Sequence, residues 1–209
     1  ARLEEWMNEP ELKGRWNRFA DEIAQNISEV FWDSKRGLFA DDPEQSYISE
    51  HAQCLAVLSG KLDENKLNTI RQTLLNEKDL AKTTISFSHY LFEAYRELGL
   101  IDAFFKRLEL WFDLESNGFK TTPEWPEPTR SDCHGWGSHP IYHCFATLLG
   151  IRPDSMGFRT VEVRPQSGHL KYINTKMVHP SGWIDVDLTF KNNCLSGSIR
   201  LPHNIHGNL

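Results

Sequence analysis

The stretch LLGIRPDSMGFRTVEVRP at residues 148–165 separates two parts of the sequence that follow different patterns. Before Gly150, apolar residues recur at every third or fourth position, which is the spacing of one face of an α-helix. After Ile151, apolar and polar residues alternate, which is the spacing of a half-buried β-strand. The sequence therefore predicts an α+β chain in which a helical part precedes a β part.

Six helices are predicted before this boundary, from apolar periodicity and from the residues that begin and end helices. They cover residues 10–32, 50–59, 63–75, 84–98, 102–115 and 140–149. The second and fourth of these helices are rich in apolar and small residues, whereas the first and fifth carry more charge. This alternation predicts two concentric layers of helices. Three helical hairpins in sequence would form half of a closed six-hairpin toroid.

Four segments of alternating apolar and polar residues follow, separated by Gly, Pro and Asn. They are TVEVRP (160–165), YINTKMV (172–178), WIDVDLTF (183–190) and LSGSIRLP (195–202). The pattern predicts mostly antiparallel strands that belong to a β-sandwich. We expect residues 1–152 to belong to a helical domain and residues 153–209 to a β-domain, and we expect the chain to be a fragment of a longer protein.

Composition excludes several function classes. The 209 residues carry 23 Lys and Arg against 29 Asp and Glu, and because the basic residues form no stripe, nucleic acid is not an expected partner. No run of 18 apolar residues is present, so we expect no membrane span, and the first residues do not resemble a signal peptide. The compartment of the protein stays open. The seven Trp, twelve Phe and five Tyr include several beside Gly, Pro and carboxylates, as in carbohydrate sites.

A long connection, NGFKTTPEWPEPTRSDCHGWGSHP at residues 117–140, joins the fifth and sixth predicted helices. Long loops are usually functional or disordered, and the aromatic residues here make disorder a poor fit. We predict a ligand-facing loop, with a structural role between the helical and β parts as the alternative. Its carboxylates are Glu124, Glu127 and Asp132, and Arg130 can bridge to one of them; we favour Asp132. A carboxylate beside a Trp can have a raised pKa, which suits general acid or base catalysis.

The histidines and cysteines of this region suggest a metal site, which we weigh against a structural role. Cys133, His134, His139 and His143 have ligand-like side chains, but only His139 and His143 could share a helical face, as zinc ligands sometimes do. We interpret them as partly buried histidines at the start of a helix and predict neither a metal nor a cofactor. The four cysteines show no CxxC spacing, so a disulfide framework is not expected.

TTPEWPEPTRSDCHGWGSHP (121–140) followed by LLGIRPDSMGFRTVEVRPQ (148–166) resembles the C-terminal part of bacterial α-L-rhamnosidases, glycoside hydrolase family 78. The upstream segment FWDSKRGLFADDPEQSYISEHAQCLAVLSG (31–60) is also similar to that family, so the resemblance covers nearly the whole chain. It implies the second half of an (α/α)6 toroid followed by a β-sandwich. It also implies hydrolysis of terminal α-L-rhamnosides with inversion, by one carboxylic acid and one glutamate base.

The resemblance places the base on Glu124, with His134 as a nearby polar group of the sugar pocket and Glu127 as the competing candidate. Two further groups of residues are expected to bind the sugar. Trp125 or Trp136 would cover the apolar edge of a deoxy sugar, and polar residues would meet its hydroxyl groups. The polar candidates are Glu127, Asp132 and, at the start of the second predicted helix, Glu50, His51 and Gln53.

The general acid expected for this family belongs to a segment that precedes these 209 residues, and no other acid here replaces it convincingly. We therefore expect the chain alone to be inactive, although it derives from an enzyme. The alternative is a non-catalytic carbohydrate-binding or scaffolding module. Half of a toroid would also expose apolar helix faces, which predicts self-association or a bound N-terminal portion.

Overall fold

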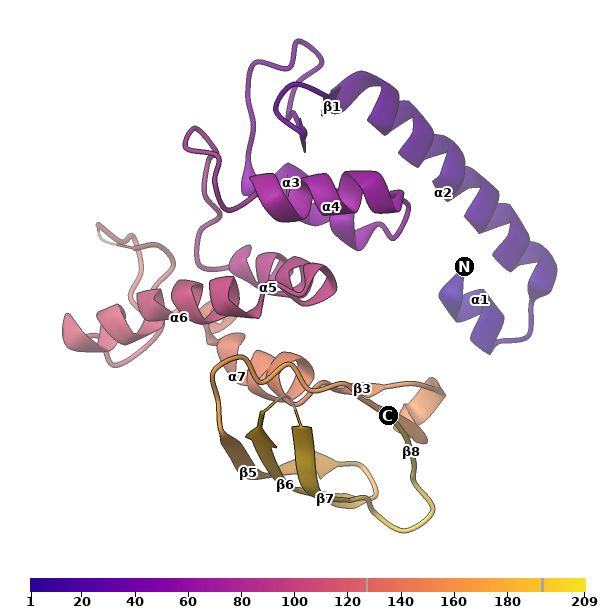
Figure 1. Ribbon diagram of the computed structural model, residues 1–209, viewed down its shortest axis with the longest axis vertical. Coiled ribbons are helices and arrows are strands. Elements are labelled where there is room, and N and C mark those ends of the chain that lie inside the picture. The colour runs from indigo at the N-terminus through magenta and orange to yellow at the C-terminus, as the bar shows by residue number, and fades with distance from the viewer. Residues whose placement is uncertain (127, 193) are drawn as a thin grey trace. The chain divides into compact units, whose positions relative to one another are not determined.

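The computed structural model describes residues 1–126, 128–192 and 194–209. Two compact units make up the chain, Ala1–Ser138 and His139–Leu209. The prediction of an α+β chain is confirmed, since long helices fill the first unit and antiparallel sheets dominate the second (Figure 1). The division lies before the boundary expected at residue 152, because Leu149, at the end of the last helical turns, packs into the core of the β unit.

The described residues of the first unit form six α-helices, one short hairpin and one 3-10 turn. The helices are α1 (Arg2–Trp6), α2 (Pro10–Phe31), α3 (Glu50–Leu58), α4 (Glu64–Thr73), α5 (Ser88–Leu98) and α6 (Ile101–Ser116). The hairpin joins β1 (Trp32–Asp33) to β2 (Leu38–Phe39). Side chains cap two of the helices where the sequence predicted them to begin, since Ser49 accepts from the N–H of Ala52 and Asp63 from that of Lys66.

The fourth predicted helix begins later than expected. It is predicted over residues 84–98, after Thr83, but α5 begins at Ser88. The reason lies in the hydrogen bonds of Thr83, whose backbone N–H and hydroxyl both donate to the carboxylate of Glu50. A threonine that is used in this way does not cap the helix that follows it.

The core of the first unit lies between α3 and α5, the two helices that were expected to be internal. α5 buries six residues and α3 four, and the two helices pack against each other. The ring of Phe92 in α5 meets that of Phe104 in α6 edge-on, with 4.6 Å between centroids. The burial of α3 and α5 therefore agrees with the apolar composition of these two helices.

Helix α2 presents an apolar face that stays accessible. None of its residues, all of which the structure describes, is buried. Its apolar side chains are between 39% and 56% exposed: Leu12, Trp16, Phe19, Ile23, Ile27 and Val30. Among the helices that the structure describes, α2 included, none has the length and apolar character needed to cross a membrane.

The second unit begins with α7 (Pro140–His143) and a π-helical segment (Cys144–Leu148), where one regular helix was predicted. Two sheets follow. One has the order β5 (Tyr172–His179), β6 (Gly182–Lys191) and β7 (Cys194–Arg200), all antiparallel. The other has the order β3 (Ile151–Pro153), β4 (Thr160–Val163) and β8 (His206–Asn208). The pair β4–β8 is parallel and departs from the antiparallel expectation, because the unpredicted strand β8 returns beside β4.

The two sheets share one core, which fits the predicted sandwich-like arrangement. Its buried side chains come from both sheets and from Leu149, two residues before β3; those of the sheets are Ile151, Val161, Val163, Ile184, Val186 and Leu188. Gly150 makes the entry into this core possible. Its φ is +65°, and a Cβ at that position would lie 1.9 Å from the carbonyl oxygen of Arg164. Only glycine tolerates both conditions.

Candidate active site

The loop after α6 folds back on itself so that residues 121–124 lie beside residues 131–134. The N–H of Glu124 donates to the carbonyl oxygen of Ser131 at 2.9 Å, and the N–H of His134 donates to that of Thr122 at 2.7 Å. The Thr122 hydroxyl also donates to the carbonyl oxygen of His134 at 2.7 Å. These bonds hold Glu124 and His134 in one small ribbon.

The end of the ribbon is fastened to the helical unit. The indole N–H of Trp111 in α6 donates to the carbonyl oxygen of Gly137 at 2.7 Å. Gly137 is buried, and a Cβ there would lie 2.7 Å from the Cβ of Thr122. Glycine therefore allows the single 3-10 turn at Gly135–Ser138 to pack against the start of the ribbon. This packing explains the second glycine of the segment GWG, Gly137.

The carboxylate of Glu124 is buried and paired with Arg130. The Glu124 side chain is 2% exposed, whereas that of Arg130 is 77% exposed. Nε of Arg130 lies 2.7 Å from Oε2 of Glu124, and the Nη2 group donates to Oε1. The guanidinium therefore contacts both oxygens of the carboxylate, in the two-pronged geometry that suits this pair of groups.

The pKa of Glu124 is lowered, chiefly by the hydrogen bond from Arg130. Burial acts in the opposite direction, while the charges of Arg130 and His134 and a hydrogen bond with the Trp125 side chain also lower it. The raised pKa expected for a carboxylate beside a Trp is therefore wrong for Glu124. A carboxylate with a lowered pKa is ionised at neutral pH, which is the form that a general base requires.

The other acidic candidates of the loop have different positions. The expectation that Arg130 pairs with Asp132 is wrong, because the guanidinium contacts Glu124 instead. Asp132 is exposed, and its carbonyl oxygen accepts from the hydroxyl of Thr121. Glu127 lies outside the described residues.

His134, Trp125 and Trp136 place aromatic surface beside this carboxylate. The rings of His134 and Trp136 lie 4.6 Å apart with an interplanar angle of 32°, and Trp136 and Trp125 are 50% and 43% exposed. Nδ1 of His134 is buried without a hydrogen-bond partner among the described residues. The loop therefore combines a buried anion, two half-exposed indoles and a histidine nitrogen that a ligand could engage.

The polar residues at the start of α3 have partners within the helical unit. The carboxylate of Glu50 is 1% exposed and accepts from Thr83 and from Arg107, whose Nη2 lies 2.5 Å from Oε1. Gln53 is fully buried and exchanges hydrogen bonds with the backbone N–H and carbonyl of Phe39. His51 is half-buried, with its ring 4.3 Å from that of Phe87. Burial gives Glu50 and Gln53 a structural role in this unit.

A polar hollow of about 400 Å³ lies beside Glu50, and most of its lining residues belong to α6. Lys82, Tyr95, Arg107 and Asp113 are among its lining residues. Burial raises the pKa of Tyr95 to about 12, and the charge of Glu50 adds to the effect. None of its described lining residues belongs to the 117–140 loop, so this hollow and the Glu124 ribbon share no described residue.

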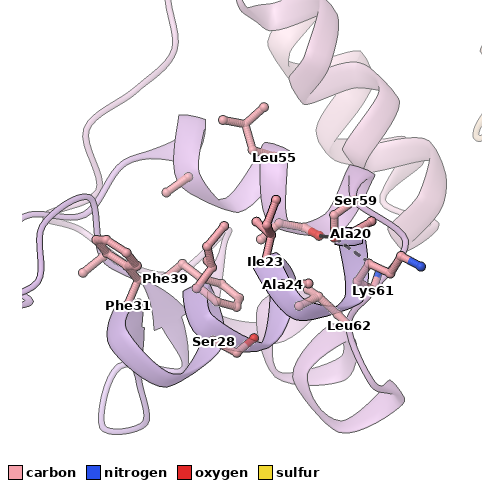
Figure 2. Close-up of a pocket in the computed structure, with 14 residues that line it drawn as sticks. Ala20, Ile23, Ala24, Ser28, Phe31, Phe39, Leu55, Ser59, Lys61 and Leu62 are labelled. Atoms are coloured by element: carbon pink, nitrogen blue, oxygen red, sulfur yellow. Dashed lines mark hydrogen bonds between the residues drawn. The ribbon is translucent and has the colours of Figure 1, made fainter. Parts of the chain in front are cut away.

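A second hollow, of about 470 Å³, lies between α2 and α3 (Figure 2). Figure 2 shows Ile23 and Ala24 of α2, Leu55 of α3 and Ser59, which follows α3, around it. Most of its lining is aliphatic or aromatic, and no carboxylate is among its described lining residues. Glycosidic bond hydrolysis needs such a group. This hollow is therefore not the candidate active site.

His139 and His143, which were predicted to lie at the start of a helix, belong to the second unit, whereas His134 belongs to the first. His143 is fully buried, with Nδ1 3.0 Å from the Thr147 hydroxyl, and the ring of His139 lies 5.6 Å from it at nearly a right angle. This agrees with the interpretation of buried histidines that make hydrogen bonds. All four cysteines are free thiols.

Comparison with known proteins supports the resemblance that the sequence showed. Residues 150–209 match the family model described as bacterial alpha-L-rhamnosidase C-terminal domain. A GH78-family rhamnosidase of Bacillus sp. GL1 matches with a TM-score of 0.71 and 23% identity, over 88% of this chain and 22% of that one. A rhamnosidase from Klebsiella oxytoca with rhamnose bound matches with a TM-score of 0.58 and 19% identity, over 65% of this chain and 29% of that one.

These similarities confirm the predicted fold: helices followed by a β-sandwich-like region, as in GH78 rhamnosidases. The chain spans less than a third of the length of either solved structure. No curated protein sequence matches it.

Proposed function

We propose that this chain is the later part of an inverting glycoside hydrolase that removes terminal α-L-rhamnose, and that it supplies the general base. The observation that carries the proposal is the Glu124 carboxylate, which is buried, ionised and set among half-exposed tryptophans. The family match over residues 150–209 and the names of both solved structures support the substrate class.

In the proposed reaction, Glu124 takes a proton from a water molecule on the far side of the anomeric carbon. The water oxygen forms a bond to that carbon while the bond to the leaving group breaks, and a general acid protonates the leaving oxygen. Inversion requires the two carboxyl groups to be about 6.5–9.5 Å apart, so that the water fits between them. His134 would orient the water or a sugar hydroxyl through its ring nitrogen.

We propose that the general acid comes from outside these 209 residues. The acidic residues after β2 already have other roles: Asp41 accepts from the Ser49 hydroxyl at 2.7 Å, and Asp42 accepts from the N–H groups of Ser46 and Tyr47. Backbone hydrogen bonds, that of Ser46 first, lower the pKa of Asp42. A general acid needs the opposite, because it must hold a proton at the working pH.

The sugar would bind against the tryptophans of the loop. Rhamnose carries a methyl group at C6, and an indole face can cover such an apolar edge. Trp125 and Trp136 are both exposed enough to offer a face. His51 could contribute a polar contact, whereas the burial of Glu50 leaves its carboxylate to Arg107 and Thr83.

The test uses the full-length protein and an aryl α-L-rhamnoside. We expect hydrolysis, and we expect proton NMR of the first product to show β-L-rhamnose before mutarotation, since inversion converts α to β. The 209-residue chain alone should show no turnover. Release of α-L-rhamnose first would contradict the inverting mechanism, and absence of turnover in the full-length protein would contradict the proposed substrate.

A second candidate function is carbohydrate binding without catalysis. The contact of Arg130 with both oxygens of Glu124 favours it, because such a pair can hold a carboxylate as a hydrogen-bond acceptor for hydroxyl groups. Calorimetric titration of the chain with L-rhamnose would then show binding, while the full-length protein would leave the aryl rhamnoside intact.

A further inference from the structure

We infer that Arg130 is the positioning residue of the proposed base: its guanidinium fixes both oxygens of the Glu124 carboxylate and keeps that group charged. The inference rests on the proposed function of Glu124. It adds a residue that no family match assigns and that contacts the base itself.

The first support is the contrast in exposure across the contact. The Glu124 side chain is almost fully buried, while Arg130 extends along the solvent side with 77% of its side chain exposed. A buried carboxylate without a cationic partner is costly and tends to bind a proton. Arg130 therefore supplies the positive charge that allows an ionised carboxylate to lie in this buried position.

The second support is that the ribbon does not depend on Arg130 for its path. Backbone groups join Glu124 to Ser131 and His134 to Thr122. The hydroxyl of Thr129 adds a bond of 3.0 Å to the carbonyl oxygen of Ser131. The guanidinium takes part in none of these bonds, so its removal should leave the ribbon in place and act on the carboxylate.

The third support is that the contact leaves room for the reaction. An ionised carboxylate has about four lone-pair positions, two on each oxygen. Arg130 uses one position on each oxygen and the Trp125 side chain a third, so one position is left for a water molecule to donate to Glu124. The arginine can therefore orient the base without blocking it.

The groups that face Glu124 indicate what removal of the Arg130 side chain would do to the pKa of that carboxylate. Arg130 and His134 both lower the pKa of the carboxylate, the hydrogen bond with Trp125 also lowers it, and burial raises it. Without Arg130, burial is opposed only by the weaker of these effects. Glu124 should then bind a proton at a higher pH, and the base should be lost on the acidic side of the activity profile.

The direct test is a titration of Glu124 in the 209-residue chain by carbon NMR, with glutamates labelled at the carboxyl carbon and the signal assigned from Glu124→Gln. We expect Arg130→Gln to raise the titration midpoint by about 1 pH unit or more. Arg130→Lys keeps the positive charge but cannot contact both carboxylate oxygens as a guanidinium does. Its midpoint should therefore lie between those of the wild type and Arg130→Gln. Arg164→Gln is the matched control, because Arg164 is 72% exposed and pairs with Glu162 in the other unit.

The companion test measures kcat/KM against pH in the full-length protein. We expect the acidic limb of the Arg130→Gln profile to move to higher pH, and Glu124→Gln to be inactive at every pH. If Glu124→Gln keeps its activity, the proposed function fails. If Glu124→Gln is inactive but the Arg130→Gln limb and the NMR midpoint do not move, the positioning role alone is wrong.

A purely structural role has its own signature. The indole N–H of Trp111, bonded to Gly137, reports on the integrity of the loop. If Arg130→Gln and Arg130→Lys both shift this NMR signal to its position in the denatured chain, Arg130 holds the loop together and the inference is overturned. An unchanged Trp111 signal with a raised Glu124 midpoint is the result we expect.

Discussion

The backbone N–H of His134 donates to the carbonyl oxygen of Thr122 at 2.7 Å, which joins two segments separated by a proline-rich turn. This one bond, with its counterpart from Glu124 to Ser131, explains why residues far apart in the motif TTPEWPEPTRSDCHGWGSHP serve one site. The buried carboxylate belongs to one segment of the ribbon and the histidine to the other. A site built in this way depends on the pairing of these two segments.

The buried pair Glu50–Arg107 should contribute strongly to the stability of the helical unit. Replacing Arg107 by Met leaves the Glu50 carboxylate, which is 1% exposed, without its closest cation. Loss of one partner of a buried pair costs about 3–5 kcal/mol. We expect the lower end in urea unfolding, because Lys82 lies 3.3 Å from the same carboxylate.

The control for that prediction is Lys61→Met, which breaks the pair between Lys61 and the 62% exposed Asp21. Exposed pairs are worth about 0–1 kcal/mol, so this variant should be close to the wild type. Equal losses in the free energy of unfolding for Arg107→Met and Lys61→Met would show that Arg107 does not compensate a buried charge.

Gly150→Ala should disrupt the β unit. The new Cβ would lie 1.9 Å from the backbone carbonyl oxygen of Arg164, and the φ of +65° disfavours any other residue. We expect a loss well above the roughly 1–2 kcal/mol that a left-handed conformation costs an alanine, because the strand entry itself must move. Hydrogen exchange of the β4 and β6 amides measures the effect.

Gly157→Ala is the matched control in the same unit. Gly157 has a similar φ of +71°, but its nearest neighbour would be a flexible arginine atom 3.9 Å away. This variant should lose only the conformational cost. Similar protection losses in the two variants would contradict the steric explanation for Gly150.

The four cysteines should react at very different rates with iodoacetamide at pH 8. Burial raises the pKa of Cys54 to about 12, and the nucleophile is the thiolate, so Cys54 should remain unlabelled until the chain is denatured. Cys133 and Cys194 are exposed and should react first. Cys144 is also exposed, but burial of its thiol raises its pKa, so it should react more slowly than they do. Peptide mass mapping gives the order, and early labelling of Cys54 would show that α3 opens in the native state.

The apolar face of α2 should cause association of the isolated chain. Its side chains are 39–56% exposed, and exposed apolar faces of this extent mark interaction surfaces. Light scattering of the wild type should give a mass above 24.2 kDa. Lysine at both Leu12 and Phe19 should reduce the mass, whereas lysine at Gln25, on the polar side of the helix, should not. A monomeric wild type would contradict this prediction.

Sequence patterns predicted the elements better than the contacts between them. The helix after Ser49 and the strands β5 and β6 could be predicted because their apolar periodicity and the residues that end them lie close together in the sequence. Those predictions are confirmed. The start of α5 could not be predicted from the neighbouring sequence, because Thr83 donates hydrogen bonds to the carboxylate of Glu50 in α3. Strand β8 lacks an alternating pattern and is placed by its partner β4.

The candidate site shows the same division. The motif pointed to Glu124, His134 and the tryptophans as candidates, but the partner of Arg130 depended on how the turn closes. We expected Asp132 to be that partner, whereas the guanidinium of Arg130 contacts Glu124. The anchoring bond from Trp111 joins residues 26 positions apart and has no local signal.

The most direct test of the account compares Glu124→Gln with Glu127→Gln in the full-length protein, with an aryl α-L-rhamnoside as substrate. The change at Glu124 removes the proposed base at nearly constant volume, so kcat should fall by about 10²–10⁴ while thermal unfolding changes little. Glu127→Gln should keep most of the activity. A fully active Glu124→Gln enzyme, or an inactive Glu127→Gln enzyme beside it, would contradict the assignment of Glu124 as the base.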